Sequence, residues 1–154
     1  MYNAAPSDYN CPICIAIQGI ENEDTWIVQD DIFYRDDLVM GFISSKSVLG
    51  SEAHPLIVPL EHHENLYNLP QGVGHRIMDL SKKIAIALKE IRNVDGVTIT
   101  QHNEPAGGQH AFHYHMHVFP RFEDDNFETE LWKAKRSTPE ERKFHAQALR
   151  EYFE

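Results

Sequence analysis

Apolar residues recur along the chain with two spacings, which separate candidate helices from candidate strands. From about residue 70 to residue 92 they recur every three or four positions, the spacing of one buried helical face. Further helices are predicted at 13–17 and at 139–153, the latter with Ser137 or Thr138 as its N-cap. Shorter runs, alternating or continuously apolar, predict strands at 26–29, 32–35, 38–43, 54–59, 97–101 and 113–119.

The order of these elements predicts the fold class. Strands come first, then the long helix, two more strands and the terminal helix, which is the order of an α+β domain with an antiparallel-looking sheet. Small residues over 44–52 predict a loop, and 93–96 predicts a turn. Because 154 residues suffice for one core and neither a repeat nor a linker interrupts them, we expect a single domain over 1–154.

Composition and charge narrow the classes of function. Hydrophobic residues make up 42% and charged residues 25%, an ordinary globular balance. The formal net charge of −10 argues against broad nucleic-acid binding, which draws on lysine and arginine, but it is compatible with one locally positive pocket for a small phosphorylated ligand. No apolar run approaches the ~20 residues that span a bilayer, and no signal peptide is visible. We therefore expect a cytoplasmic protein without a membrane partner.

The segment 113–119 carries three histidines at alternate positions, His113, His115 and His117. In a strand, alternate side chains share a face, so the imidazoles would line one face while the intervening apolar residues face the core. Such imidazoles suit a metal site, or covalent catalysis in which one attacks phosphorus and its neighbours hold the oxyanion. Ordinary surface polarity explains three identical heterocycles poorly. The spacing alone favours metal binding and phosphoryl chemistry equally.

The loop before this segment shifts the balance toward phosphoryl chemistry. Residues 103–109 place two adjacent glycines between two carboxamides, Asn103 and Gln109. Glycines let backbone N–H groups form a concave anion site, and carboxamides supply neutral donors to phosphate oxygens. A metal site needs neither, although a plain hairpin turn also uses paired glycines.

Residues 108–121 resemble the signature of the histidine-triad (HIT) family, in which Gly-Gln precedes three histidines that alternate with apolar residues. Upstream, His54-Pro-Leu-Ile-Val-Pro59 followed by His62 resembles a second family segment. Cys11-Pro-Ile-Cys14 resembles the opening of a zinc-binding bacterial branch. The resemblance runs from about residue 11 to 121 and implies a HIT-like α+β fold, a small nucleotide substrate and a homodimer.

The resemblance also implies roles for individual residues. His115 would be the nucleophile that forms a covalent nucleotidyl-imidazole intermediate, since a neutral imidazole with a pKa of ~6.5 is available at neutral pH. Its other ring nitrogen should donate to a backbone carbonyl. His117 would contact the phosphoryl oxygens, and Asn103, Gly108 and Gln109 would form the phosphate-binding loop.

Two positions depart from the family pattern. His110 stands where relatives carry a serine or threonine that helps protonate the leaving group, so we interpret it as a catalytic general acid with a different pH dependence. Ser44 stands where relatives carry an aspartate that binds the ribose hydroxyls. We assign Phe42, Ser44 and His110 to the nucleotide site, and this departure puts the preference for a nucleotide in doubt.

The pair Cys11 and Cys14 predicts a metal or redox site rather than a structural disulfide. Redox Cys-Pro-x-Cys motifs usually follow a strand, and the preceding residues are not one. A tetrahedral zinc site needs two more ligands. The resemblance implies that they are His62 and His113, with His63 as the competitor of His62. Zinc would then be structural, and the chemistry itself would need no cofactor.

We therefore predict a hydrolase or transferase that releases a nucleoside monophosphate from an ester, a phosphoramidate or a dinucleoside polyphosphate. Adenine is the base assumed. Two alternatives stay open: a metal-dependent enzyme that uses the three histidines as ligands, and a non-catalytic nucleotide-binding signalling module. Trp26 and Trp132 are interpreted as packing residues, although Trp132 would also suit the closing of a partner subunit's pocket.

Overall fold

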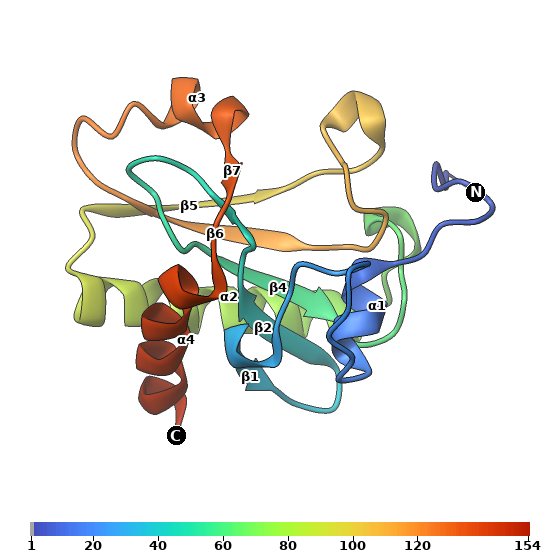
Figure 1. The fold of residues 1–154 in the computed structure, drawn as a ribbon, viewed down its shortest axis with the longest axis horizontal. Helices are drawn as coiled ribbons and strands as arrows, with labels where there is room; N and C mark the ends of the chain where they lie inside the picture. Colours follow the sequence, from blue (N-terminus) through green and yellow to red (C-terminus); the bar gives the residue numbers. More distant parts are fainter. Residues whose placement is uncertain (1) are drawn as a thin grey trace.

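The computed structural model describes residues 2–154 and confirms the α+β class (Figure 1). No helix in this range is long and apolar enough to cross a membrane. In chain order the elements are α1 (Pro12–Ile17), η1 (Gln29–Asp31), β1 (Ile32–Arg35), β2 (Val39–Ile43), β3 (Lys46–Ser47), β4 (Pro55–Pro59), η2 (Leu66–Asn68), α2 (Gln71–Arg92), β5 (Gly96–Gln101), η3 (Pro105–Gly107), β6 (Met116–Arg121), α3 (Phe127–Glu130), η4 (Leu131–Lys133), β7 (Lys135–Arg136) and α4 (Pro139–Phe153).

One antiparallel sheet has the strand order β1-β2-β4-β6-β5, and β3 pairs with β7 in a separate ribbon. The long helix α2 covers one face of the sheet. The three-and-four spacing places Ile77, Leu80, Ile84, Leu88 and Ile91 on one face. The first four are buried, whereas Ile91 at the end of the helix is 39% exposed. The edge strand β5 pairs with β6 alone among the described strands. The expected homodimer stays a prediction.

The opposite face of the two central strands is covered as well. Met40, Phe42, Leu56 and Val58 cluster there with residues of α1. All residues of β2 and β4 are therefore buried. Burial on both faces explains why these two segments are continuously apolar, since a strand that is half exposed would alternate.

Strand β6 begins at Met116, so the predicted strand over 113–119 is wrong at its first three residues. The ladders that join β6 to β4 and to β5 both stop at Met116. Without a strand partner the preceding chain turns away, and the N–H of Tyr114 donates to the carbonyl of His63 instead. His113 therefore does not lie on the strand face, and its side chain is wholly buried.

The predicted strand over 26–29 is also wrong, because this segment lacks a ladder partner. The carbonyl of Trp26 accepts from the guanidinium of Arg142 on α4, and the N–H of Val28 donates to the carboxylate of Asp31. Arg142 and Asp31 form a buried ion pair with an N–O distance of 2.8 Å. The terminal helix thus holds the extended segment through side chains rather than through a sheet.

Candidate functional site

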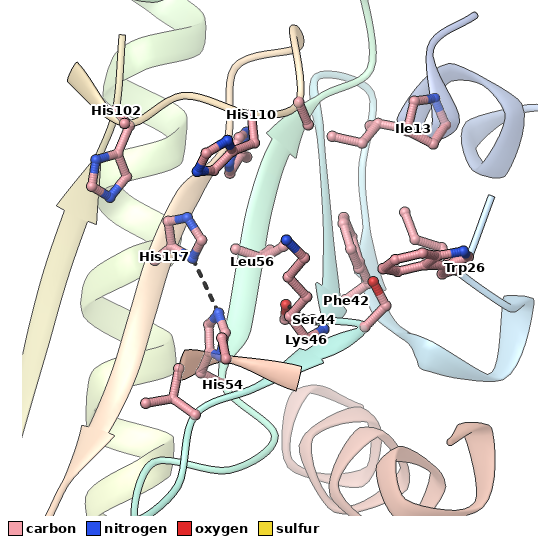
Figure 2. Close-up of a pocket in the computed structure, with 18 of the residues that line it drawn as sticks. Ile13, Trp26, Phe42, Ser44, Lys46, His54, Leu56, His102, His110 and His117 are labelled. Atoms are coloured by element: carbon pink, nitrogen blue, oxygen red, sulfur yellow. Dashed lines mark hydrogen bonds between the residues drawn. The ribbon is translucent and has the colours of Figure 1, made fainter. Parts of the chain in front are cut away.

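A cavity of about 580 Å³ opens on the face of the sheet opposite α2 (Figure 2). One end is apolar, and the other is lined by five histidines. Six of the predicted site residues line the cavity, namely Phe42, Ser44, Gly108, His110, His115 and His117. Two further histidines, His54 and His102, complete the imidazole end although they are not among the predicted site residues.

His115 has one ring nitrogen occupied by the backbone. Its Nδ1 lies 2.7 Å from the carbonyl oxygen of His113, and because a carbonyl only accepts, Nδ1 carries the proton. The lone pair is left on Nε2. Burial lowers the pKa of His115 below its ordinary value, so the ring is neutral at neutral pH. An unprotonated imidazole nitrogen is the form in which histidine attacks an electrophile.

His117 and His54 form a pair in which Nδ1 of the first and Nε2 of the second are 3.1 Å apart (Figure 2). Nδ1 of the wholly buried His54 has no partner among the described residues. Leaving a buried acceptor nitrogen unpaired costs less free energy than leaving a buried N–H unpaired. The favoured tautomer of His54 therefore carries its proton on Nε2, which donates to Nδ1 of His117. The proton of His117 is then on Nε2, where it can be donated to an oxyanion.

The loop between β5 and β6 depends on Gly108, whose φ is +89°. A Cβ at this position would lie 3.2 Å from Nδ1 of His102, which itself lies 2.8 Å from the carbonyl oxygen of Gly107. Both the left-handed backbone and the close approach therefore require glycine. The absence of a side chain leaves this edge of the cavity open to a ligand.

The carboxamides of Asn103 and Gln109 do not line the cavity. Gln109 is buried, and its Nε2 donates to the carbonyl of Glu64. Oδ1 of Asn103 accepts from the N–H of Leu66 at 2.7 Å. These carboxamides hold the loop against the chain that precedes α2, and a direct contact with a nucleotide stays a prediction.

The apolar end of the cavity includes Ile13 of α1, Phe42 of β2 and Leu56 of β4. Trp26 and Trp132 line it as well, and 42% and 73% of their surfaces are exposed. Neither tryptophan is buried in the core, although the guanidinium of Arg136 packs over the Trp26 ring at 4.6 Å from its centre. Partly exposed aromatic rings at a cavity mouth offer flat apolar surfaces on which a planar ligand can stack.

A second cluster joins the N-terminus to the start of β6. The side chains of Cys11, Cys14, His62 and His113 bring one ligand atom each to within 4.8 Å of one another. Sγ of Cys14 lies 3.2 Å from Nδ1 of His62 and 3.5 Å from Nδ1 of His113. Tetrahedral zinc with ordinary bond lengths would hold sulfur and nitrogen ligands roughly 3.6 Å apart.

The second nitrogen of His113 supports the same geometry. Its Nε2 donates to the carbonyl of Pro59 at 2.9 Å, which leaves the lone pair of Nδ1 directed at the two sulfur atoms. His63 is outside the cluster, with its Nε2 3.7 Å from the carboxylate of Glu61. The four side chains fit a closed zinc site, and it is His62 rather than His63 that lies with the other three.

Comparison with known proteins identifies the family. The family model for the HIT domain matches residues 27–124, which is more than half of the chain. The chain belongs to the HIT family. An uncharacterized HIT-like protein from Borreliella burgdorferi is 38% identical over 96 residues, 61% of this chain and 68% of that protein. An adenylylsulfatase from Arabidopsis thaliana is 29% identical over 60% of this chain and 46% of its own length.

Solved HIT structures share the fold. A HIT-like protein involved in cell-cycle regulation from Bartonella henselae has a TM-score of 0.72 at 25% identity, over 94% of this chain and 97% of that one. A zinc-bound histidine-triad protein from Mycobacterium smegmatis has a TM-score of 0.71 at 24% identity, over 92% and 91%. The diadenosine triphosphate hydrolase of Plasmodium falciparum has a TM-score of 0.71 at 19% identity, over 99% and 88%.

The histidine pair of this HIT protein should make its stability depend on pH. Burial, with repulsion from His115 and Arg92, lowers the pKa of His54 to about 3. Because the unfolded chain binds a proton near pH 6.5, the stability that neutral His54 contributes falls as the pH drops below that value. Urea titrations at pH 7 and pH 5 measure this effect. Over this range the free energy of unfolding of the parent should fall by roughly 2 kcal/mol more than that of His54→Gln.

The matched control is His75→Gln, on the exposed side of α2. This control should keep the pH dependence of the parent. An unchanged slope in His54→Gln would contradict a neutral, buried His54. The comparison holds even if the variant is less stable at both pH values.

The segment 54–59 contained a signal for His54, but the prediction assigned this histidine no role in the site. His54 opens the segment that resembles the upstream family motif, yet its contact with His117 joins residues 63 positions apart. His102, Trp26 and Trp132 carried no comparable signal. They reach the cavity from the end of β5, the extended segment before η1 and the 3-10 turn η4.

Proposed function

We propose that this HIT protein is a nucleotidyl hydrolase in which His115 attacks the α-phosphorus of a nucleoside 5′-monophosphate joined to a leaving group. The observation that carries the proposal is the hydrogen bond from Nδ1 of His115 to the carbonyl of His113, which leaves an unprotonated Nε2 at a cavity wall. HIT proteins are nucleotide-binding hydrolases and transferases, and the relatives include an adenylylsulfatase and a diadenosine triphosphate hydrolase.

The proposed reaction has two displacements at phosphorus. The lone pair of Nε2 forms a bond to phosphorus while the bond to the leaving group breaks, and His110 supplies the proton that the leaving group takes. His110 is exposed, so solvent can reprotonate it. Water then attacks phosphorus and releases one proton to the solvent, the phosphorus–nitrogen bond breaks and neutral His115 is restored. The products are a nucleoside monophosphate and the protonated leaving group.

Two groups are suited to hold the phosphoryl oxygens during these steps. The favoured tautomer of His117 has an N–H on Nε2, a neutral donor to the charge that develops on the oxygens. Gly108 brings the backbone of its loop to the cavity without a side chain in the way. The apolar end, with Phe42 and Trp26, suits a nucleobase, for which adenine is the first to test.

The experiment is incubation with adenosine 5′-phosphoramidate, followed by chromatography for AMP and by mass spectrometry of the quenched protein. We expect release of AMP and an adenylyl adduct on the peptide that contains His115. Turnover that vanishes with a chelator while the fold persists would favour a metal-dependent enzyme. Binding of AMP with neither turnover nor adduct would favour a non-catalytic module.

We also propose that Cys11, Cys14, His62 and His113 bind one structural zinc ion. The donor set, the S–N distances of 3.2–3.5 Å and the zinc-bound relative support this assignment. When bound, zinc would fix the N-terminal segment to the start of β6, and it would supply no chemistry to the reaction. The carbonyl of His113 also orients His115, so the zinc site would support the nucleophile indirectly.

A further inference from the structure

The cavity contains a single permanent positive charge. Of the side chains that line it, Lys46 alone is a lysine or arginine, and Asp24 alone is a carboxylate. No carboxylate among residues 2–154 lies within ion-pair distance of the Lys46 ammonium. The rest of the chain is strongly acidic, with a net charge of −10. An unpaired lysine in a cavity of such a protein is a candidate ligand for an anion.

Lys46 is solvent-exposed and lines the cavity. Figure 2 shows its side chain between the paired rings of His54 and His117 and the side formed by Phe42 and Trp26. Two interactions fix the backbone of Lys46. Its N–H donates to Oγ of Ser44 at 3.2 Å, and β3, to which it belongs, pairs with β7. Lys46 therefore lies between the proposed nucleobase end and the imidazole end.

His54 and His117, the paired rings of the imidazole end, cannot balance additional negative charge. Burial holds the pKa of His117 well below its ordinary value and that of His54 at about 3. Both rings are neutral at pH 7 and offer hydrogen bonds without charge. One phosphoryl group can be held by such neutral donors, but a second phosphate adds charge that neutral donors compensate poorly.

We propose that Lys46 binds a second phosphate of the substrate, in addition to the phosphate that His115 attacks. This inference rests on the proposed function of the same cavity. The second phosphate has two possible sources, the ribose or the polyphosphate chain of the leaving group. The sugar must cross the cavity beside Ser44, Ser45 and Lys46. Two hydroxyls and a cation at this place accommodate a ribose phosphate better than a carboxylate side chain would.

The test compares Lys46→Met with the parent on substrates matched in pairs. Adenosine 5′-phosphosulfate and its 3′-phosphorylated form differ by a ribose phosphate. Adenosine 5′-phosphoramidate has one phosphate and ammonia as its leaving group, whereas diadenosine triphosphate has three phosphates and ADP as its leaving group. We expect kcat/KM to fall by about 10- to 100-fold for the substrate with additional phosphate in one of the two pairs, which identifies the source. The single-phosphate members should change by less than about threefold, and Lys46→Arg should retain most of the activity.

The control is Lys133→Met, which removes a lysine of η4 that pairs with Glu130 outside the cavity lining. It should leave all four substrates unchanged. Equal losses on the single-phosphate substrates and on those with additional phosphate would overturn the proposal, as would no loss on any of them.

Binding measurements keep this inference separate from the proposed function. Calorimetric titrations with AMP, ADP and adenosine 3′,5′-bisphosphate need no turnover. If the protein hydrolyses nothing, the hydrolase proposal fails, yet Lys46→Met should still weaken binding of ADP or of the bisphosphate by about tenfold or more, and that of AMP by much less. The same loss for all three ligands, or for none, overturns the role of Lys46.

Discussion

His115→Ala should lower kcat for adenosine 5′-phosphoramidate by on the order of 10⁴-fold and abolish the covalent adduct. Removing the nucleophile leaves the binding groups in place but removes the atom that forms the bond to phosphorus, and nucleophile deletions in covalent enzymes have effects of this size. The affinity for AMP should change far less, because the apolar end and His117 are intact. Steady-state kinetics, mass spectrometry and calorimetry on one preparation measure all three quantities.

Two comparisons make this result specific. His75→Ala removes an exposed histidine of α2 outside the cavity lining and should leave turnover unchanged. Thermal unfolding should show that His115→Ala stays folded, since its ring contributes one hydrogen bond to the backbone of the same segment. A loss of less than about tenfold in kcat would contradict the assignment of His115 as nucleophile.

Loss of the metal should destabilise the protein by about 4 kcal/mol and lower Tm by roughly 10 °C. A ligand present at about a thousand times its Kd stabilises the folded state by that amount, and a domain of this length shifts by a few degrees per kcal/mol. The proposed zinc site should have a large effect because it would join α1 to the start of β6, with Cys11 and His113 separated by 102 positions in the sequence. Differential scanning calorimetry before and after dialysis against a chelator measures the shift.

Adjacent histidines provide the matched control for the zinc site. His62→Ala should lose the metal and most of the stabilisation, whereas His63→Ala should retain one zinc per chain, because His63 lies outside the cluster. Cys11→Ala should lose the zinc and His115→Ala should keep it. Metal analysis that finds zinc in His62→Ala but none in His63→Ala would reverse the assignment.

The same preparation tests whether the metal takes part in the reaction. At a temperature where the chelated protein remains folded, turnover should fall by less than about tenfold, since zinc would act on His115 only through the position of the His113 carbonyl. Complete loss of turnover in a folded, metal-free protein would instead support the alternative in which histidines bind a catalytic metal.

Local patterns predicted the elements whose formation depends on their own residues. The helix α2 follows from apolar positions that recur every three or four residues, and α4 follows from the N-cap expected at Ser137 or Thr138. In the structure Thr138 is that cap, and it exchanges hydrogen bonds with Glu141. The segment 26–29 has the composition of a strand but no strand lies beside it, so this prediction failed. Whether an apolar extended segment enters a sheet depends on a partner that is distant in sequence.

The sequence by itself determined the family, the α+β class and the three alternating histidines, because these depend on residue types at short and regular spacings. Only the tertiary structure separated the three histidines. The ladders on both sides of β6 end at Met116, so His113 turns to the cysteines while His115 and His117 remain at the cavity. The tertiary structure also decided which distant residues join them, His54 beside His117 and Lys46 as the one cation of the cavity. These contacts arise from the packing of strands far apart in the chain, and no local spacing encodes them.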